Sequence, residues 1–277
     1  NANVQGIKPT FSLEEKVLML LLKHLFGKSN RDMACMTVLF SWLTGITVSY
    51  KTIERLYSEE AVLLALHNLH ILILDKKNVE MVDCAGDGTG YALTVKKHYA
   101  SYAQALKDSA KDQTNKKTKG LPKKKKFVYS FVLLDLDTKM HIGFGTSFKS
   151  EREAYQRALQ VAKRSGIKVK SLRLDRYYSN QKDVKELQEL FGDLTMFLIP
   201  KKDATVRGCL KWSHMMKQFI TNTLEYLKEY YKRNQSESTF SEDKKRVGWK
   251  LGQKREDRID TANILTSLWH NLYWLGG

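Results

Sequence analysis

The chain has 277 residues and carries 47 lysine and arginine residues against 30 acidic ones, a formal net charge of +17 at pH 7. This excess favours a polyanionic partner, with nucleic acid as the first candidate and an anionic membrane surface as the second. The longest apolar runs, 17–26 and 61–74, are too short to cross a bilayer, so we expect no membrane partner. Three widely spaced cysteines without a CxxC pair favour a reducing cytoplasm and argue against a disulfide framework or a structural zinc site.

Residues 11–75 carry helical patterns throughout. A first helix opens at Ser12, which is a candidate N-cap, and a second spans 29–43. After a turn that contains Gly45, a third helix opens at Ser49. The sequence therefore predicts an all-helical N-terminal part.

The helix, turn and helix of 29–70 have two interpretations. They can form a DNA-binding helix-turn-helix, with Tyr50, Lys51 and Arg55 on the first turns of the recognition helix, or an ordinary helical hairpin. The basic charge of the chain favours DNA binding, although the local sequence leaves both open. On the first interpretation, residues 1–76 form a helix-turn-helix-like DNA-binding region.

From residue 78 onward strand and helix patterns alternate. In chain order they are a glycine-interrupted strand at 78–95, a hairpin at 127–148, a helix at 150–166, a strand at 169–175, a helix at 183–192, a strand at 193–200 and a long helix at 211–233. This order predicts a second domain, 77–277, of the α/β class, with a mixed sheet flanked by helices. It is also the element order of an RNase H-like fold.

A lysine-rich stretch at 96–126 separates the first strand from the hairpin. Seven lysines lie between residues 116 and 126 without a single acid, so they cannot all be paired. We expect an electrostatic clamp on the phosphates of flanking or target DNA; the alternative is a solvated loop. The candidate contacts are Lys123, Lys124, Lys125 and Lys126.

Three carboxylates are candidate metal ligands. Asp175 closes a predicted strand, the position at which sites gather in α/β sheets, and Asp87 is flanked by glycines that let a bulky backbone such as DNA approach. Asp83 is the alternative to Asp87, because the segment that it ends, EMVD, is more typical of the end of an apolar strand. Glu237 is the third acid. Carboxylate oxygens are the ligands that Mg²⁺ prefers, and a pair of such ions can activate water and stabilise a leaving oxygen at a phosphodiester.

Glu237 belongs to a set of four residues. Counted from Tyr230, they lie at offsets of 0, 3, 7 and 14 residues: Tyr230, Arg233, Glu237 and Lys244. On one continuous helix these positions fall within an arc of about 60°. The alternative interpretation is a solvated helix face with helix-spaced ion pairs. An apolar stripe beside the arc is expected to pack on the sheet. Its members are Ile220, Leu224, Leu227 and Tyr231.

The four residues resemble the Y-x2-R-x3-E-x6-K signature of a group of DDE-type insertion-sequence transposases, at the required spacing. GDGTGYAL, at 86–93, resembles the first-aspartate segment of that family and favours Asp87 over Asp83. LRLDRYYSN, at 172–180, resembles the second-aspartate segment. The resemblance extends over about 78–277.

The resemblance implies a DNA transposase with an RNase H-like catalytic domain. The three acids would hold two Mg²⁺ or Mn²⁺ ions, and Tyr230, Arg233 and Lys244 would bind DNA phosphates beside them. The enzyme would cut one strand at each transposon end, and the freed 3′-hydroxyl would attack target DNA. We expect a homodimer on double-stranded DNA and a location at the nucleoid of a prokaryotic cytoplasm.

Two other functions stay open. A transposase-derived DNA-binding protein without catalysis would not need all three acids, and an RNase H-like nuclease without strand transfer would not need the four-residue signature. The interval from Asp175 to Glu237 is too short for the large β-rich insertion of some relatives. The seven histidines are scattered, with no HxH or HExxH spacing, so we expect them to be structural or solvent-facing.

Overall fold

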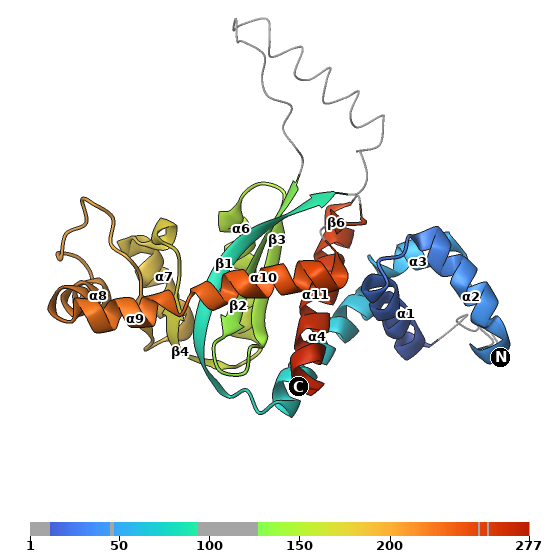
Figure 1. Cartoon of the computed structure of the whole chain (residues 1–277), viewed down its shortest axis with the longest axis horizontal. Coiled ribbons are helices and arrows are strands. Elements are labelled where there is room, and N and C mark those ends of the chain that lie inside the picture. The colour runs from blue at the N-terminus through green and yellow to red at the C-terminus, as the bar shows by residue number, and fades with distance from the viewer. Residues whose placement is uncertain (1–11, 45–46, 94–126, 249, 254, 277) are drawn as a thin grey trace, which may run out of the picture.

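The computed structural model describes residues 12–44, 47–93, 127–248, 250–253 and 255–276 (Figure 1). The lysine clamp predicted at Lys123, Lys124, Lys125 and Lys126 lies outside these ranges. No helix in the described ranges combines the length and the apolar character that a membrane crossing requires.

The N-terminal part is helical, as predicted. Its helices are α1 (Leu13–Leu25), α2 (Asn30–Thr44), α3 (Tyr50–Leu56) and α4 (Glu60–Lys76). Ser12 caps α1 through a reciprocal pair of hydrogen bonds with Glu15, which satisfies two backbone donors that a helix start leaves free. The prediction of one continuous helix across 49–70 was wrong. The chain breaks after α3 because Tyr57 turns inward, where its carbonyl accepts a 2.6 Å hydrogen bond from Thr261.

A mixed sheet forms the centre of the molecule, in the order β3-β2-β1-β4-β5. Its strands are β1 (Met81–Leu93), β2 (Phe127–Asp135), β3 (His141–Ser147), β4 (Lys168–Arg173) and β5 (Thr195–Phe197), and the short β6 (Lys250–Leu251) pairs with β1. β2 is antiparallel to both neighbours, whereas β1, β4 and β5 run parallel. The predicted mixed sheet flanked by helices is confirmed.

Helices cover both faces of this sheet (Figure 1). They are α6 (Glu151–Arg164), α7 (Gln181–Phe191), α8 (Leu210–Thr221), α9 (Thr223–Tyr231), α10 (Asn234–Val247) and α11 (Glu256–Gly276). On one face α6 lies so close to β3 that a Cβ at Gly143 or Gly145 would clash with the α6 backbone. On the other face α10 and α11 cross the strands, and Ser130 of β2 donates a 2.9 Å hydrogen bond to Asn263 of α11.

The N-terminal helices and α11 share one hydrophobic core with the sheet. Trp269 of α11 donates a 2.8 Å hydrogen bond to the carbonyl of Leu21, and His24 lies 2.9 Å from the hydroxyl of Thr266. The two ends of the chain therefore stabilise each other. The division at residue 76 stays a prediction.

The long helix predicted at 211–233 is interrupted. Asn222 adopts φ −127° and ψ 51°, which ends α8 and starts α9 with a new rotational phase. The prediction that the apolar stripe packs on the sheet was therefore wrong, since Ile220, Leu224 and Tyr231 are 60%, 77% and 56% exposed. Tyr226 turns inward in their place, and its hydroxyl accepts a 2.8 Å hydrogen bond from the Leu198 amide.

Candidate functional site

Three carboxylates surround a single guanidinium. Arg233 Nη1 lies 3.3 Å from Asp87 Oδ1, and Nη2 lies 2.9 Å from Glu237 Oε1 and 3.9 Å from Asp175 Oδ2. Because all three contacts share one planar group, their carboxylate oxygens are within about 10 Å of one another. The structure thus brings together the three acids singled out in the sequence, which we call the acid cluster.

Each acid comes from a different element. Asp87 lies in the middle of β1, opposite Val132 of β2. Asp175 lies two residues after the end of β4 and accepts a 2.9 Å hydrogen bond from the Tyr177 amide, which caps the short 3-10 turn η2 (Arg176–Tyr178). Glu237 lies in the first turn of α10. Because β1 and β4 are parallel neighbours and α10 crosses the sheet, the topology sets the position of all three acids.

Asp83 is placed elsewhere. It accepts a hydrogen bond from Ser171 on β4, and Lys170 Nζ lies 4.0 Å from its other oxygen. No ion pair in the described part of the chain joins it to Arg233. The geometry therefore places Asp87, and not Asp83, in the acid cluster.

The acid cluster is buried on one side and open on the other. The side chains of Asp87 and Arg233 are 20% and 12% exposed, whereas those of Asp175 and Glu237 are 48% and 55% exposed. Burial raises the pKa of Asp87 to about 6, although Arg233 acts in the opposite direction. Burial also lowers the pKa of Arg233, but Asp87 and the other nearby negative groups outweigh it and leave that pKa above its ordinary value.

The other two signature residues are largely buried. Tyr230 is 8% exposed, and burial raises the pKa of its hydroxyl. Lys244 is 9% exposed; its Nζ donates a 2.6 Å hydrogen bond to Thr89 and lies 5.2 Å from the ring centre of Tyr91. Lys244 therefore packs against β1, two residues beyond Asp87 along the strand.

The signature residues do not share one regular helix. Tyr230 is in α9 and Glu237 is in α10, with Lys232 and Arg233 in a tight turn between them. Arg233 donates its backbone N–H to the Tyr230 carbonyl, an i to i−3 bond that tightens this turn. The turn keeps Arg233 four residues before Glu237, so the pair still meets.

The candidate DNA-reading residues Tyr50, Lys51 and Arg55 are exposed on α3, and the Arg31 guanidinium lies 5.3 Å from the Tyr50 ring centre. Figure 1 places α3 and α9 at opposite ends of the molecule. These residues are therefore separate from the acid cluster.

Sequence reasoning missed a fourth acid near the cluster. Glu151 begins α6, and its Oε1 accepts a 2.9 Å hydrogen bond from the hydroxyl of Tyr178. Its carboxyl group lies against Gly88, where an added Cβ would approach its Cδ to 2.5 Å, and its charge contributes to the raised pKa of Asp87. The available signal was Gly88 itself, since a residue without a side chain in a strand marks a close approach.

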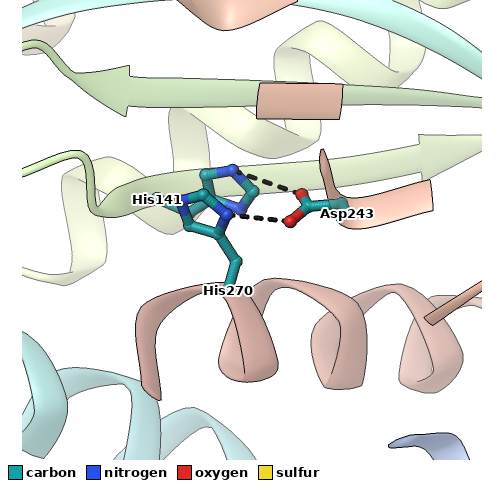
Figure 2. Close-up of side chains that lie close together, drawn as sticks. All are labelled: His141, Asp243 and His270. Atoms are coloured by element: carbon teal, nitrogen blue, oxygen red, sulfur yellow. Dashed lines mark hydrogen bonds and ion pairs between the residues drawn. The ribbon is translucent and has the colours of Figure 1, made fainter. Parts of the chain in front are cut away.

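Sequence reasoning also missed a buried cluster of His141, Asp243 and His270 (Figure 2). His270 Nε2 donates a 2.6 Å hydrogen bond to the Lys139 carbonyl, and its Nδ1 lies 2.8 Å from Asp243 Oδ1. His141 Nε2 lies 3.6 Å from the other Asp243 oxygen. The prediction of scattered histidines did not anticipate this contact, which joins α10 to α11 and β3. We call these three residues the buried histidine cluster.

The two clusters differ as metal sites. In the buried histidine cluster the rings are stacked 3.7 Å apart with a 5° interplanar angle. A nitrogen lone pair lies in the plane of its ring, so two parallel stacked rings cannot both bind one ion as they lie. The acid cluster offers hard oxygen atoms, and a single cation already contacts all three of its acids. Its donor set fits Mg²⁺ or Mn²⁺.

The fold and this site define a mixed α/β protein with a carboxylate cluster beside its central parallel strands. No family model matches the chain. A protein of Archaeoglobus fulgidus named "Probable transposase for insertion sequence element ISA1214" is 43% identical to it over 261 residues, which cover 94% of this chain and 74% of the relative. The chain belongs to the insertion-sequence transposases.

Proposed function

We propose that the chain is a DDE-type DNA transposase that cuts one strand at each transposon end and joins the freed 3′-hydroxyl to target DNA. The observation that carries this proposal is the meeting of Asp87, Asp175 and Glu237 at one guanidinium. The relative's name supports a transposase. A second support is the Y-x2-R-x3-E-x6-K spacing, which indicates one group of DDE-type transposases. The residues at this spacing are Tyr230, Arg233, Glu237 and Lys244.

The sheet order supports an RNase H-like catalytic domain at 77–277. Three antiparallel strands are followed by two that run parallel to β1, and the acids lie on β1, after β4 and on α10. Helix α3 carries exposed Tyr50, Lys51 and Arg55, which supports a DNA-reading region within 1–76. We assign transposon-end recognition to this region and leave phosphate binding to the catalytic domain.

The acid cluster would hold two Mg²⁺ or Mn²⁺ ions, which supply Lewis-acid activation of the attacking hydroxyl and stabilisation of the leaving oxygen. Asp87 provides the buried, fixed ligand, whereas Asp175 and Glu237 face solvent and can meet the substrate. Arg233 and Tyr230 orient the scissile phosphate by charge-assisted and hydroxyl hydrogen bonds. Lys244 supports β1 behind Asp87 and adds positive charge near the DNA backbone.

The test uses the full chain and a duplex that ends in the inverted repeats flanking its gene, with Mg²⁺ and a target plasmid. We expect strand nicking at the repeat end and covalent joining of that end to the plasmid, by a homodimer on paired ends. Binding without nicking would favour the non-catalytic DNA-binding protein. Nicking of ends without joining would favour the nuclease.

A further inference from the structure

Arg233 occupies the centre of the acid cluster. Its guanidinium contacts Asp87, Asp175 and Glu237 within 3.9 Å, and no other cation forms an ion pair with these acids in the described ranges. One positive charge therefore faces three negative ones. The metal ions of the proposed function would compete with this guanidinium for the same three carboxylates, because each cation is stabilised by the same negative charges.

The contacts that hold Arg233 are incomplete. Its Nε is buried without a hydrogen-bond partner among the described residues, which costs free energy. Its contact with Asp175, at 3.9 Å, is too long for a hydrogen bond. The side chain also starts from the tight turn before α10, and Asp175 and Glu237 are half-exposed, so two of its three partners are in contact with solvent. Arg233 is thus held mainly by charge, with the Tyr230 hydroxyl as a further partner, and another anion can compete for it.

We propose that Arg233 is an internal counter-ion that closes the acid cluster in the DNA-free protein, and that a DNA phosphate draws it away so that metal and DNA load together. This inference rests on the proposed metal function of the acid cluster. An arginine can pair with two oxygens of a phosphate as well as with carboxylates, so the exchange replaces one charge-assisted contact with another. Once Arg233 has left, the three carboxylates would be free to hold metal ions.

The exchange makes metal and DNA binding cooperative. By thermodynamic linkage, the factor by which DNA raises metal affinity equals the factor by which metal raises DNA affinity. A protein built in this way keeps its phosphodiester chemistry inactive until a substrate strand lies beside the acids. Arg233 would therefore oppose metal binding in one state and assist the reaction in the other.

The test is a Mn²⁺ titration of the DNA-free full chain, with free Mn²⁺ followed by electron paramagnetic resonance. Replacing Arg233 by Gln (R233Q) removes the counter-ion and should tighten Mn²⁺ binding by roughly tenfold or more. The matched control is Lys232→Gln, since Lys232 is the adjacent residue, carries the same charge and pairs with Glu229 at 2.5 Å on the surface. It should change the affinity by less than about threefold.

The titration is repeated with an uncut end duplex, after subtraction of the Mn²⁺ bound by that duplex alone. The duplex should tighten Mn²⁺ binding to the wild type and leave R233Q little changed. Equal affinities of wild type and R233Q without DNA, or weaker binding by R233Q, would overturn the inference and leave the proposed function standing. Absence of Mn²⁺ binding by both proteins, with and without DNA, would instead defeat the proposed function. Should R233Q fail to fold, a wild-type affinity that does not respond to the duplex would still refute the exchange.

Discussion

The two charged clusters of α10 contrast in their surroundings. At its start, Glu237 is 55% exposed and shares Arg233 with two other acids. Six residues later, Asp243 is 3% exposed and lies beside two stacked histidine rings, with one oxygen near each ring. The acid cluster has half-exposed carboxylates whose contacts a ligand can replace. The buried histidine cluster is almost completely shielded from solvent. One helix thus carries an exchangeable site at one end and a fixed anchor near the other.

The acid cluster should be essential for chemistry, and this is the largest effect that we expect. Replacing Asp87 or Asp175 by Asn, or Glu237 by Gln, should lower the rate of end cleavage by about 10³-fold or more, because the acids act as one unit. End-DNA binding, measured by fluorescence anisotropy, should change little. The control is Asp83→Asn, four residues earlier on β1, which should cleave at nearly the wild-type rate. A cleavage rate for this control as low as that of Asp87→Asn would show that the first acid was misassigned.

The buried histidine cluster should matter for stability. Asp243→Ala leaves His270 without its buried carboxylate partner and should lower the free energy of unfolding by about 3–5 kcal/mol, measured by urea denaturation. The matched control is Glu242→Ala on the same helix, whose 43% exposed side chain pairs with Arg246. It should cost about 1 kcal/mol or less. Similar losses for the two variants would mean that Asp243 does not anchor α10.

Asp87 should reduce stability at neutral pH. Its folded pKa of about 6 lies above its ordinary value of 3.8, so the folded state binds more protons than the unfolded state between these values. Stability therefore falls as pH rises through that window. Asp87→Asn should stabilise the metal-free protein by about 1–2 kcal/mol at pH 7.5, and this gain should disappear below about pH 4. Equal stability of the two proteins at pH 7.5, measured by urea denaturation, would show that the pKa of Asp87 is not raised in the folded state.

Local sequence determined most of the element types and singled out most residues of the candidate site. Ser12, Ser49 and Ser150 begin helices as N-caps because their hydroxyls accept backbone N–H groups that a helix start leaves free. Strand-like and helix-like hydrophobic patterns alternate along the chain, and this order predicted a mixed sheet flanked by helices. The pattern is informative because hydrophobic residues repeat every 2 residues in a strand and about every 3.6 residues in a helix. The spacing of Arg233 and Glu237 also placed their side chains together, since residues four apart are neighbours across a helical turn.

Only the tertiary structure decided how these parts face one another. The break at Asn222 changed the phase of α9, so Leu224 became exposed and Tyr226 turned inward to Leu198, a partner distant in sequence. The contact of Arg233 with Asp87 joins residues 146 positions apart, and that of His270 with the Lys139 carbonyl joins residues 131 apart. Periodicity reports only which side of its own element a residue occupies. The partner across the core depends on the packing of the whole sheet with α10 and α11, because buried charges and polar groups must find their partners there.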